Sequence, residues 1–251
     1  MKLRFFFSVV AWVVLAGLAL QLFFLGRIAL MAVADPQSTA FQRSEAWRTA
    51  WNGRADGQAW RWRQRWVDQP DLGKAIQRAV IASEDGGFYS HGGVDWSAIE
   101  SAWQRNTRRQ EQAEKRAEKL GDPAKVKPPK IAGGSTITQQ LAKNLLLSGE
   151  RTLLRKGQEL VLTLMLEALL DKDRILTIYL NSVEWGEGVF GVEAAAQRYF
   201  KKSAKALSNA EAARLAVMLP SPKFFEKRPQ SPYLNRRTAT IAARMVQVNL
   251  P

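Results

Sequence analysis

The chain has no cysteine and a single histidine, His91, among its 251 residues. The lack of cysteine excludes disulfide bridges, thiolate nucleophiles, iron–sulfur clusters and cysteine zinc sites. A lone histidine excludes any site that needs two imidazoles, including the HExxH zinc proteases. Acidic residues are also few, 23 against 37 Lys and Arg, which gives a formal charge of +14. Any chemistry must therefore rely on carboxylates, amines, guanidinium groups and hydroxyls.

One long apolar run lies at the N-terminus, over residues 5–25, and contains no charged residue. As a helix it would be about 31 Å long, which matches the hydrocarbon core of a bilayer. Lys2 and Arg4 precede the run and predict a cytoplasmic N-terminus with the rest of the chain outside. A cleaved signal peptide is the alternative, because residues 32–34 read Ala-Val-Ala. The run is too long for that, and Arg27 separates it from the cleavage motif, so an uncleaved anchor is favoured.

The chain therefore divides into a transmembrane anchor, residues 1–34, and one domain, residues 35–251. Hydrophobic residues make up 46% of the chain, enough for a real core. Strand-like alternation is almost absent, and a helix N-cap is expected at Asp95 and a capping box at residues 208–211. Helical spacing predicts helices at residues 71–83, 136–148, 155–170, 172–181, 191–200, 209–219 and 236–249.

Two segments do not follow this helical pattern. Residues 60–66 interleave Trp with basic residues, a pattern that can bind nucleic acid by base stacking and phosphate contacts. The same pattern can lie at lipid headgroups, which the predicted anchor upstream favours over nucleic acid. Packing of the Trp side chains on the core is an equally good explanation. Residues 104–130 hold nine basic and four acidic residues and end rich in proline. We expect this second segment to be a solvated extension or a mobile loop outside the core.

The first cluster able to carry chemistry is residues 83–95, where adjacent carboxylates, glycines and His91 follow the end of a predicted helix. A carboxylate at a helix end can face a cleft and have its proton affinity set by its neighbours. Glu84 is therefore the candidate general base. The alternative is that Glu84 and Asp85 only terminate the helix and the glycines form a turn.

The second cluster is residues 133–144, in which two glycines and hydroxyl residues precede a helix. Such a helix start can present free N–H donors to an anion. Gln140, Lys143 and Asn144 lie on one face of that helix. The pattern is not a Walker A loop, so nucleotide hydrolysis has no support. An ordinary helix cap with an exposed lysine is the alternative.

The third cluster, residues 151–159, places three cations before Glu159. Arg155 and Glu159 are spaced i,i+4, which predicts either a simple ion pair or part of a cationic clamp on a phosphorylated leaving group. Residues 171–173 read Asp-Lys-Asp, a weak metal motif that is better explained as a helix N-terminus.

Taken in order, these blocks resemble the peptidoglycan glycosyltransferase family, whose members polymerise lipid II into glycan strands. The resemblance covers roughly residues 70–220, and the absence of an S-x-x-K motif favours the monofunctional biosynthetic transglycosylases over penicillin-binding proteins. The matching stretches are EDGGFYSHGGVDW (84–96), GGSTITQQLAKNLLL (133–147), RKGQE (155–159) and KDRILTIYLNSVEWGEGVFGVEAAAQRYF (172–200).

The resemblance implies a mainly α fold, with a larger lysozyme-like lobe and a smaller membrane-facing lobe around a cleft. The basic insert at 104–130 occupies the position of the family's mobile flap. Glu84 would be the general base, and Glu159 the second essential glutamate on the leaving-group side. The other residues that match substrate-binding or positioning sites of the family are Lys143, Arg151, Arg155, Lys156, Ser135, Thr136, Gln139, Gln140, Asn144, Asp85 and His91.

The implied activity is inverting transfer from lipid II, with release of undecaprenyl diphosphate, by an enzyme of the inner membrane with a periplasmic catalytic domain. No cofactor and no protein metal site are expected, with Mg²⁺ or Mn²⁺ as an optional assistant at the pyrophosphate. The expected partners are lipid II, the growing glycan, membrane lipids and cell-division or elongation proteins, and not nucleic acid. Two rival functions stay open, a lytic enzyme that cuts glycan and a non-catalytic membrane scaffold or nucleic-acid binder.

Overall fold

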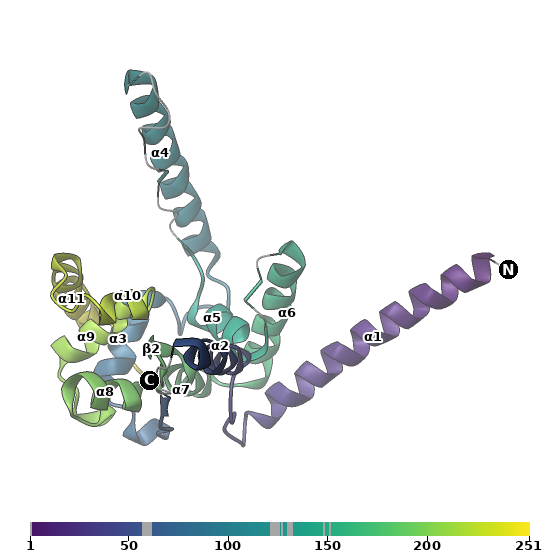
Figure 1. Cartoon of the computed structure of the whole chain (residues 1–251), viewed down its shortest axis with the longest axis horizontal. Helices are drawn as coiled ribbons and strands as arrows, with labels where there is room; N and C mark the ends of the chain where they lie inside the picture. The colour runs from purple at the N-terminus through teal and green to yellow at the C-terminus, as the bar shows by residue number, and fades with distance from the viewer. Residues whose placement is uncertain are drawn as a thin grey trace.

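The structure is a computed structural model that describes residues 2–56, 62–120, 126, 128–129, 133–147, 149–150 and 152–251. It is mainly helical, as the sequence predicts (Figure 1). The division into two lobes and the domain boundary after residue 34 stay predictions. The helices are α1 (Lys2–Leu30), α2 (Ala40–Asp56), α3 (Lys74–Glu84), α4 (Trp96–Leu120), α5 (Ile137–Leu146), α6 (Leu153–Leu169), α7 (Lys172–Ser182), α8 (Val192–Phe200), α9 (Asn209–Met218), α10 (Pro222–Glu226) and α11 (Pro232–Arg244).

The N-terminal helix α1 projects from the body of the protein, and Arg4–Leu30 is long and apolar enough to cross a membrane (Figure 1). Only its C-terminal turns join the body, where Phe24 and Ile28 are buried in the core. The junction that follows is tied to α7, because the guanidinium of Arg174 donates to the carbonyls of Met31 and Ala34 at 2.7 and 2.9 Å. Helix α1 is therefore attached to the body of the protein by defined contacts.

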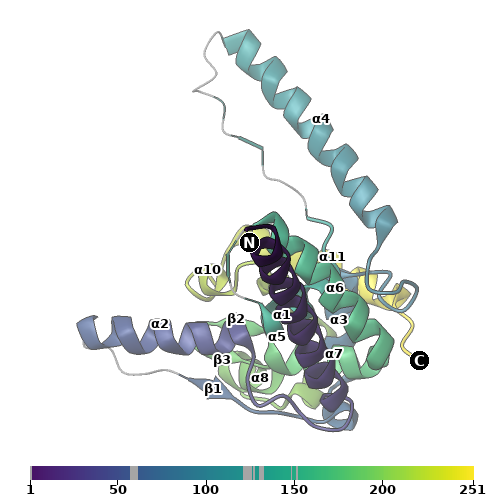
Figure 2. The same ribbon diagram turned by 90° about the vertical axis from the view of Figure 1, so that its right-hand side faces the viewer.

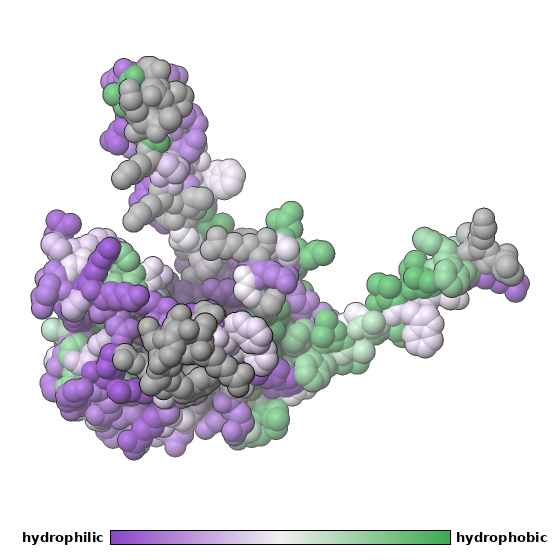
Figure 3. Space-filling model, in the orientation of Figure 1, coloured by the Kyte–Doolittle hydropathy of each residue, from purple (hydrophilic) through white to green (hydrophobic). Residues whose placement is uncertain are grey.

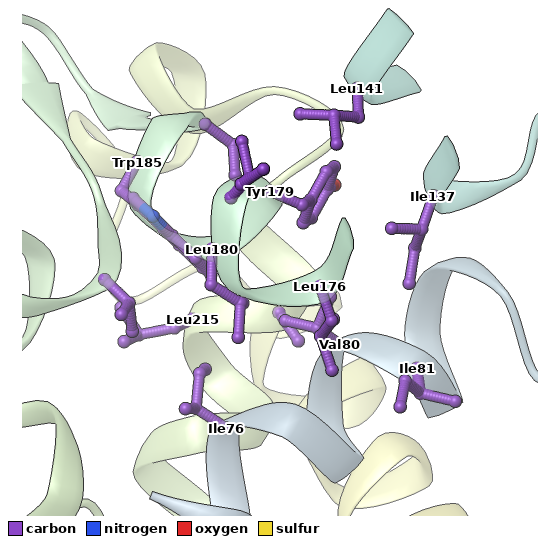
Figure 4. Close-up of a cluster of buried hydrophobic side chains, with 14 of the residues drawn as sticks. Ile76, Val80, Ile81, Ile137, Leu141, Leu176, Tyr179, Leu180, Trp185 and Leu215 are labelled. Carbon is purple, nitrogen blue, oxygen red and sulfur yellow. The ribbon is translucent and has the colours of Figure 1, made fainter. Parts of the chain in front are cut away.

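The core lies among α3, α5, α7 and α9, which come from separate parts of the sequence. Figure 4 shows side chains from α3, α5 and α7 meeting around Leu176 and Tyr179. Ile76, Leu141 and Leu180 are fully buried there. The apolar spacing of each helix therefore turns one face inward, and the packed helices carry the residues of the clusters identified above.

A small three-stranded sheet closes one side of this core, in the order β1–β3–β2. The strands are β1 (Arg63–Gln64), β2 (Glu184–Gly186) and β3 (Val189–Phe190), with β1 parallel and β2 antiparallel to β3. Trp62 packs on Phe190 with ring centroids 4.5 Å apart, and Trp66 packs against the core. Trp60 and Arg61 lie outside the described residues. For Trp62 and Trp66, packing is the explanation that the structure supports.

The charged segment at residues 104–130 was expected to be a solvated extension or a mobile loop, and its described part is an extension and not a loop. Residues 104–120 belong to the continuous helix α4, which extends away from the body (Figure 2). Alanine, glutamate, lysine and arginine are strong helix formers, which explains why this segment is a helix and not a loop. The segment is solvent-exposed along most of its length, as an extension outside the core should be. Most of residues 121–132 lie outside the described part of the chain.

Local helix signals were confirmed where the sequence was explicit. Asp95 accepts a hydrogen bond from the Ala98 N–H at 2.8 Å at the start of α4. Ser208 and Glu211 form the expected capping box of α9. Asp171 caps α7 by accepting from the Arg174 N–H, which agrees with the helix-terminus explanation of Asp-Lys-Asp. By contrast, α2 and α10 were not predicted.

Candidate active site

Glu84 is the last residue of α3 and is partly buried. Its Oε2 accepts a hydrogen bond from Gln140 Nε2 at 3.1 Å, and its Oε1 accepts one from the Ser83 hydroxyl at 3.2 Å. The Tyr179 hydroxyl donates to Gln140 Oε1 at 2.9 Å, which fixes the orientation of that amide. Desolvation raises the pKa of Glu84, and the hydrogen bond from Gln140 opposes this rise only in part.

Asp85 is 7% exposed and binds two elements together. One oxygen accepts from the Ile137 N–H at the start of α5, at 2.9 Å, and the other lies 2.8 Å from His91 Nε2. The Gly93 N–H donates to His91 Nδ1, so the neutral imidazole carries its proton on Nε2 and donates it to Asp85. Asp85 and His91 therefore act as positioning residues that hold α5 against the end of α3.

The start of α5 corrects one expectation, that its N–H groups are free to bind an anion. The Thr136 side chain accepts from the Gln139 N–H, and the Gln139 side chain accepts from the Thr136 N–H, in a capping box. Asp85 takes the Ile137 N–H. The N–H groups of Thr136, Ile137 and Gln139 are thus already used within the protein, and both Thr136 and Gln139 are buried. Ser135 is exposed.

Gly93 makes the loop before this cap as compact as it is. Its φ is +86°, a backbone conformation that residues other than glycine rarely adopt, and an added Cβ would lie 2.7 Å from the Glu167 side chain. The Gly93 carbonyl accepts from the Thr136 hydroxyl at 2.6 Å. This glycine therefore lets the loop after α3 lie directly against the start of α5.

The second glutamate, Glu159 on α6, is buried and fully paired. Arg155 Nη1 donates to its Oε2 at 2.9 Å, and the Lys156 ammonium donates to its Oε1. The predicted i,i+4 ion pair is confirmed. The Nε atom of Arg155 is buried and has no hydrogen-bond partner among the described residues. Arg151 lies outside the described residues.

A groove of about 400 Å³ brings the second and third clusters together. Gln140, Lys143 and Asn144 line it from one face of α5, as their spacing predicts, and Arg155 lines it from α6. Gln140 connects this groove to Glu84, because its amide donates to the carboxylate. The full lining is Phe41, Ser44, Gln140, Lys143, Asn144, Leu147, Gly149, Glu150, Arg155, Tyr179, Val183, Glu184, Leu219 and Pro222.

Several of these lining residues were not identified from the sequence. Tyr179 and Glu184 lie within the stretch that resembles the family, but no local pattern assigns either a role. Phe41 and Ser44 come from α2, whose sequence shows no motif. The capping role of Thr136 and Gln139 did have a signal, since Thr-x-x-Gln before an apolar run is a capping box.

Comparison with protein families matches this chain to the transglycosylase family model over residues 54–116 and 123–246. These ranges contain Glu84, Glu159 and the groove residues of α5 to α7. The chain belongs to the transglycosylase family, and it is a glycosyltransferase.

Similar curated proteins carry a more particular description, biosynthetic peptidoglycan transglycosylase. That of Paraburkholderia xenovorans is 46% identical over 99% of this chain and 94% of its own length. That of Paraburkholderia phytofirmans is 47% identical over 96% of this chain and 91% of its own length. A third, from Burkholderia pseudomallei, is 48% identical over 94% and 84% of the two chains.

Proposed function

We propose that this transglycosylase is a peptidoglycan glycosyltransferase of cell wall synthesis that polymerises lipid II into linear β-1,4 glycan strands. One observation carries the proposal: a single groove joins Gln140, the hydrogen-bond partner of the Glu84 carboxylate, to the cations Lys143 and Arg155. Base catalysis and stabilisation of a diphosphate leaving group need those two kinds of side chain close together.

Glu84 acts as the general base in this proposal. Its carboxylate accepts the proton of the sugar 4-hydroxyl of the acceptor, and the hydroxyl oxygen attacks the anomeric carbon of the donor. The bond between that carbon and the diphosphate oxygen breaks, so an α-linked donor yields a β-1,4 bond and undecaprenyl diphosphate. Desolvation strengthens the base by raising the pKa of Glu84, and Gln140 holds the carboxylate in orientation.

The leaving group is stabilised by cations and needs no proton. Lys143 and Arg155 line the groove, and we assign both to the diphosphate, together with Arg151 and Lys156. Glu159 supports the leaving-group side by holding Arg155, because its Oε2 accepts a hydrogen bond from Arg155 Nη1 at 2.9 Å. Ser135 and Asn144 are assigned to substrate binding, whereas Thr136, Gln139, Asp85 and His91 maintain the geometry of α5.

The carboxylate of Glu159 is not placed to bind a divalent cation. Mg²⁺ and Mn²⁺ prefer carboxylate oxygens, but Arg155 and Lys156 occupy both oxygens of this side chain. The proposal therefore places no metal on Glu159 and routes no step through one.

The proposed setting is the inner membrane, with α1 as a single-pass anchor, the N-terminus in the cytoplasm and the catalytic body in the periplasm. α1 contacts α6, and α6 begins with Leu153 and Leu154, whose side chains are 92% and 88% exposed. Figure 3 shows hydrophobic surface along α1 and at the start of α6. The anchor keeps the groove near lipid-linked substrate, and the net positive charge suits anionic lipid. Lipid II and the growing strand are the proposed partners, with cell-division or elongation proteins.

Glu84→Gln tests the proposal, because it preserves shape and removes the base. In a lipid II polymerisation assay we expect a loss of about 10²- to 10⁴-fold in rate, with folding retained by circular dichroism. Glu114→Gln, on the exposed part of α4, is the matched control and should keep full activity. Full activity in Glu84→Gln would contradict the proposal and favour a scaffold.

A second substrate separates polymerisation from lysis. The wild-type protein should extend lipid II and release no soluble fragments from purified cell wall. Release of soluble muropeptides without strand growth would instead identify a lytic enzyme.

A further inference from the structure

Glu184 on β2 lies in the groove, but it has no role in the chemistry described above. Its side chain is 8% exposed, and it lines the groove together with Gln140, Lys143 and Arg155. Its Oε1 atom is buried, and among the described residues its partner is one ammonium, that of Lys223 at 3.2 Å, in an ion pair without good hydrogen-bond geometry. A buried carboxylate that is not fully satisfied is costly, so its presence beside a cavity needs an explanation.

The cation nearest to Glu184 is shared with another carboxylate. Lys223 Nζ lies 3.2 Å from Glu184 Oε1, and the same ammonium donates to Glu45 Oε2 at 2.5 Å. Glu45 also binds Arg48 at 2.7 Å. Burial raises the pKa of Glu184 to about 7 in spite of Lys223. The ammonium, which Glu184 shares with Glu45, therefore compensates Glu184 only in part, and the carboxylate can accept a further hydrogen bond.

We propose that Glu184 is a saccharide-binding residue, whose carboxylate accepts a hydrogen bond from a hydroxyl or amide N–H of the sugar that occupies the groove. This inference rests on the proposed function and adds a residue that positions the sugar. A volume of about 400 Å³ falls within the range of small-ligand sites. The substrate would add a hydrogen-bond donor to a carboxylate whose cation is shared with Glu45.

The chemistry of the groove separates the sugar from the diphosphate. A carboxylate repels phosphate, so Glu184 cannot serve the leaving group. Lys143 and Arg155, from α5 and α6, carry positive charge into the same groove. β2 and α10 supply Glu184 and Pro222, and α2 supplies Phe41 and Ser44. Glu150, just before α6, is a second carboxylate in the lining, on the same side as the cations. Glu184 is instead on β2, and a ligand whose neutral sugar lies at Glu184 and whose anionic end lies at Lys143 and Arg155 satisfies both.

Two variants of the full-length protein test the role of Glu184. Glu184→Met removes the acceptor and keeps most of the side-chain volume, and Lys223 still has Glu45 as its partner. We expect the KM for lipid II to rise about tenfold, the factor that one hydrogen bond of about 1.4 kcal/mol provides, with kcat within about threefold. Glu184→Gln retains a carbonyl acceptor and should restore KM to within about threefold of wild type.

Glu187→Gln is the matched control, three residues further on and outside the groove lining. It should leave both kinetic constants unchanged. Thermal unfolding of each variant separates loss of folding from loss of binding. A wild-type KM in a folded Glu184→Met variant would overturn the inference, as would equal KM defects in the Met and Gln variants, which would show that the acceptor is not what matters.

The substrate offers donors in both its sugars and its peptide, so lipid II with a shortened peptide is assayed in parallel. A KM ratio between Glu184→Met and wild type that persists supports the saccharide, and its disappearance overturns that assignment. If wild-type protein polymerises neither substrate, the proposed function itself is wrong, which is a different result from a normal wild type with an unaffected variant.

Discussion

Removing the Asp85 carboxylate should loosen the joint between α3 and α5, and the structure allows the cost to be worked out. Asp85→Ala leaves two donors without an acceptor, the Ile137 N–H and the His91 Nε2–H, which now bond at 2.9 and 2.8 Å. Each bond to a charged acceptor contributes about 1.5–3 kcal/mol. Burial raises the pKa of Asp85, so part of this gain is offset by desolvation. We expect a net loss of about 2–4 kcal/mol in the free energy of unfolding.

For a chain of this size, that loss lowers Tm by about 5–15 °C. Thermal unfolding of the detergent-solubilised protein, followed by circular dichroism, measures it. Lipid II polymerisation should also fall, because the helix that carries Gln140 loses its attachment beside Glu84. Asp71→Ala is the control, since its exposed pair with Lys205 should contribute less than about 1 kcal/mol. A Tm for Asp85→Ala within 2 °C of wild type would refute the reasoning.

Two further predictions concern stability in the same region. Desolvation raises the pKa of Glu84 in the folded protein, so ionisation of this carboxyl favours unfolding. The wild-type protein should therefore lose stability relative to Glu84→Gln as the pH rises from 4 to 8. A Tm difference between the two proteins that is the same at pH 4 and pH 8 would contradict this. Gly93→Ala should cost about 2 kcal/mol or more, because φ is +86° and the new Cβ meets Glu167; urea unfolding measures it, and an unchanged midpoint would show that the loop relaxes freely.

Features that depend on neighbouring residues in the chain were predictable from the sequence. The apolar run of α1, the capping residues Ser208 and Asp171, and the common face of Gln140, Lys143 and Asn144 all follow from local spacing. The ion pair of Arg155 with Glu159 follows from the same rule. Where local rules conflicted, the more specific one prevailed, as at the start of α5, where the capping box uses the donors expected to bind an anion.

The sequence by itself determined the helical character, the long apolar N-terminal helix, the carboxylates and cations available for chemistry, and the family to which the chain belongs, because each depends on contiguous stretches of chain. Only the tertiary structure decided that Tyr179 orients Gln140 beside Glu84 and that α2 lines the groove. It also decided that Glu184 enters the groove with an ammonium that it shares with Glu45. These relations join residues about 40 to 140 positions apart, and no periodicity encodes them. They arise because burying the apolar faces of α3, α5 and α7 together leaves polar side chains facing one another at the edge of the core.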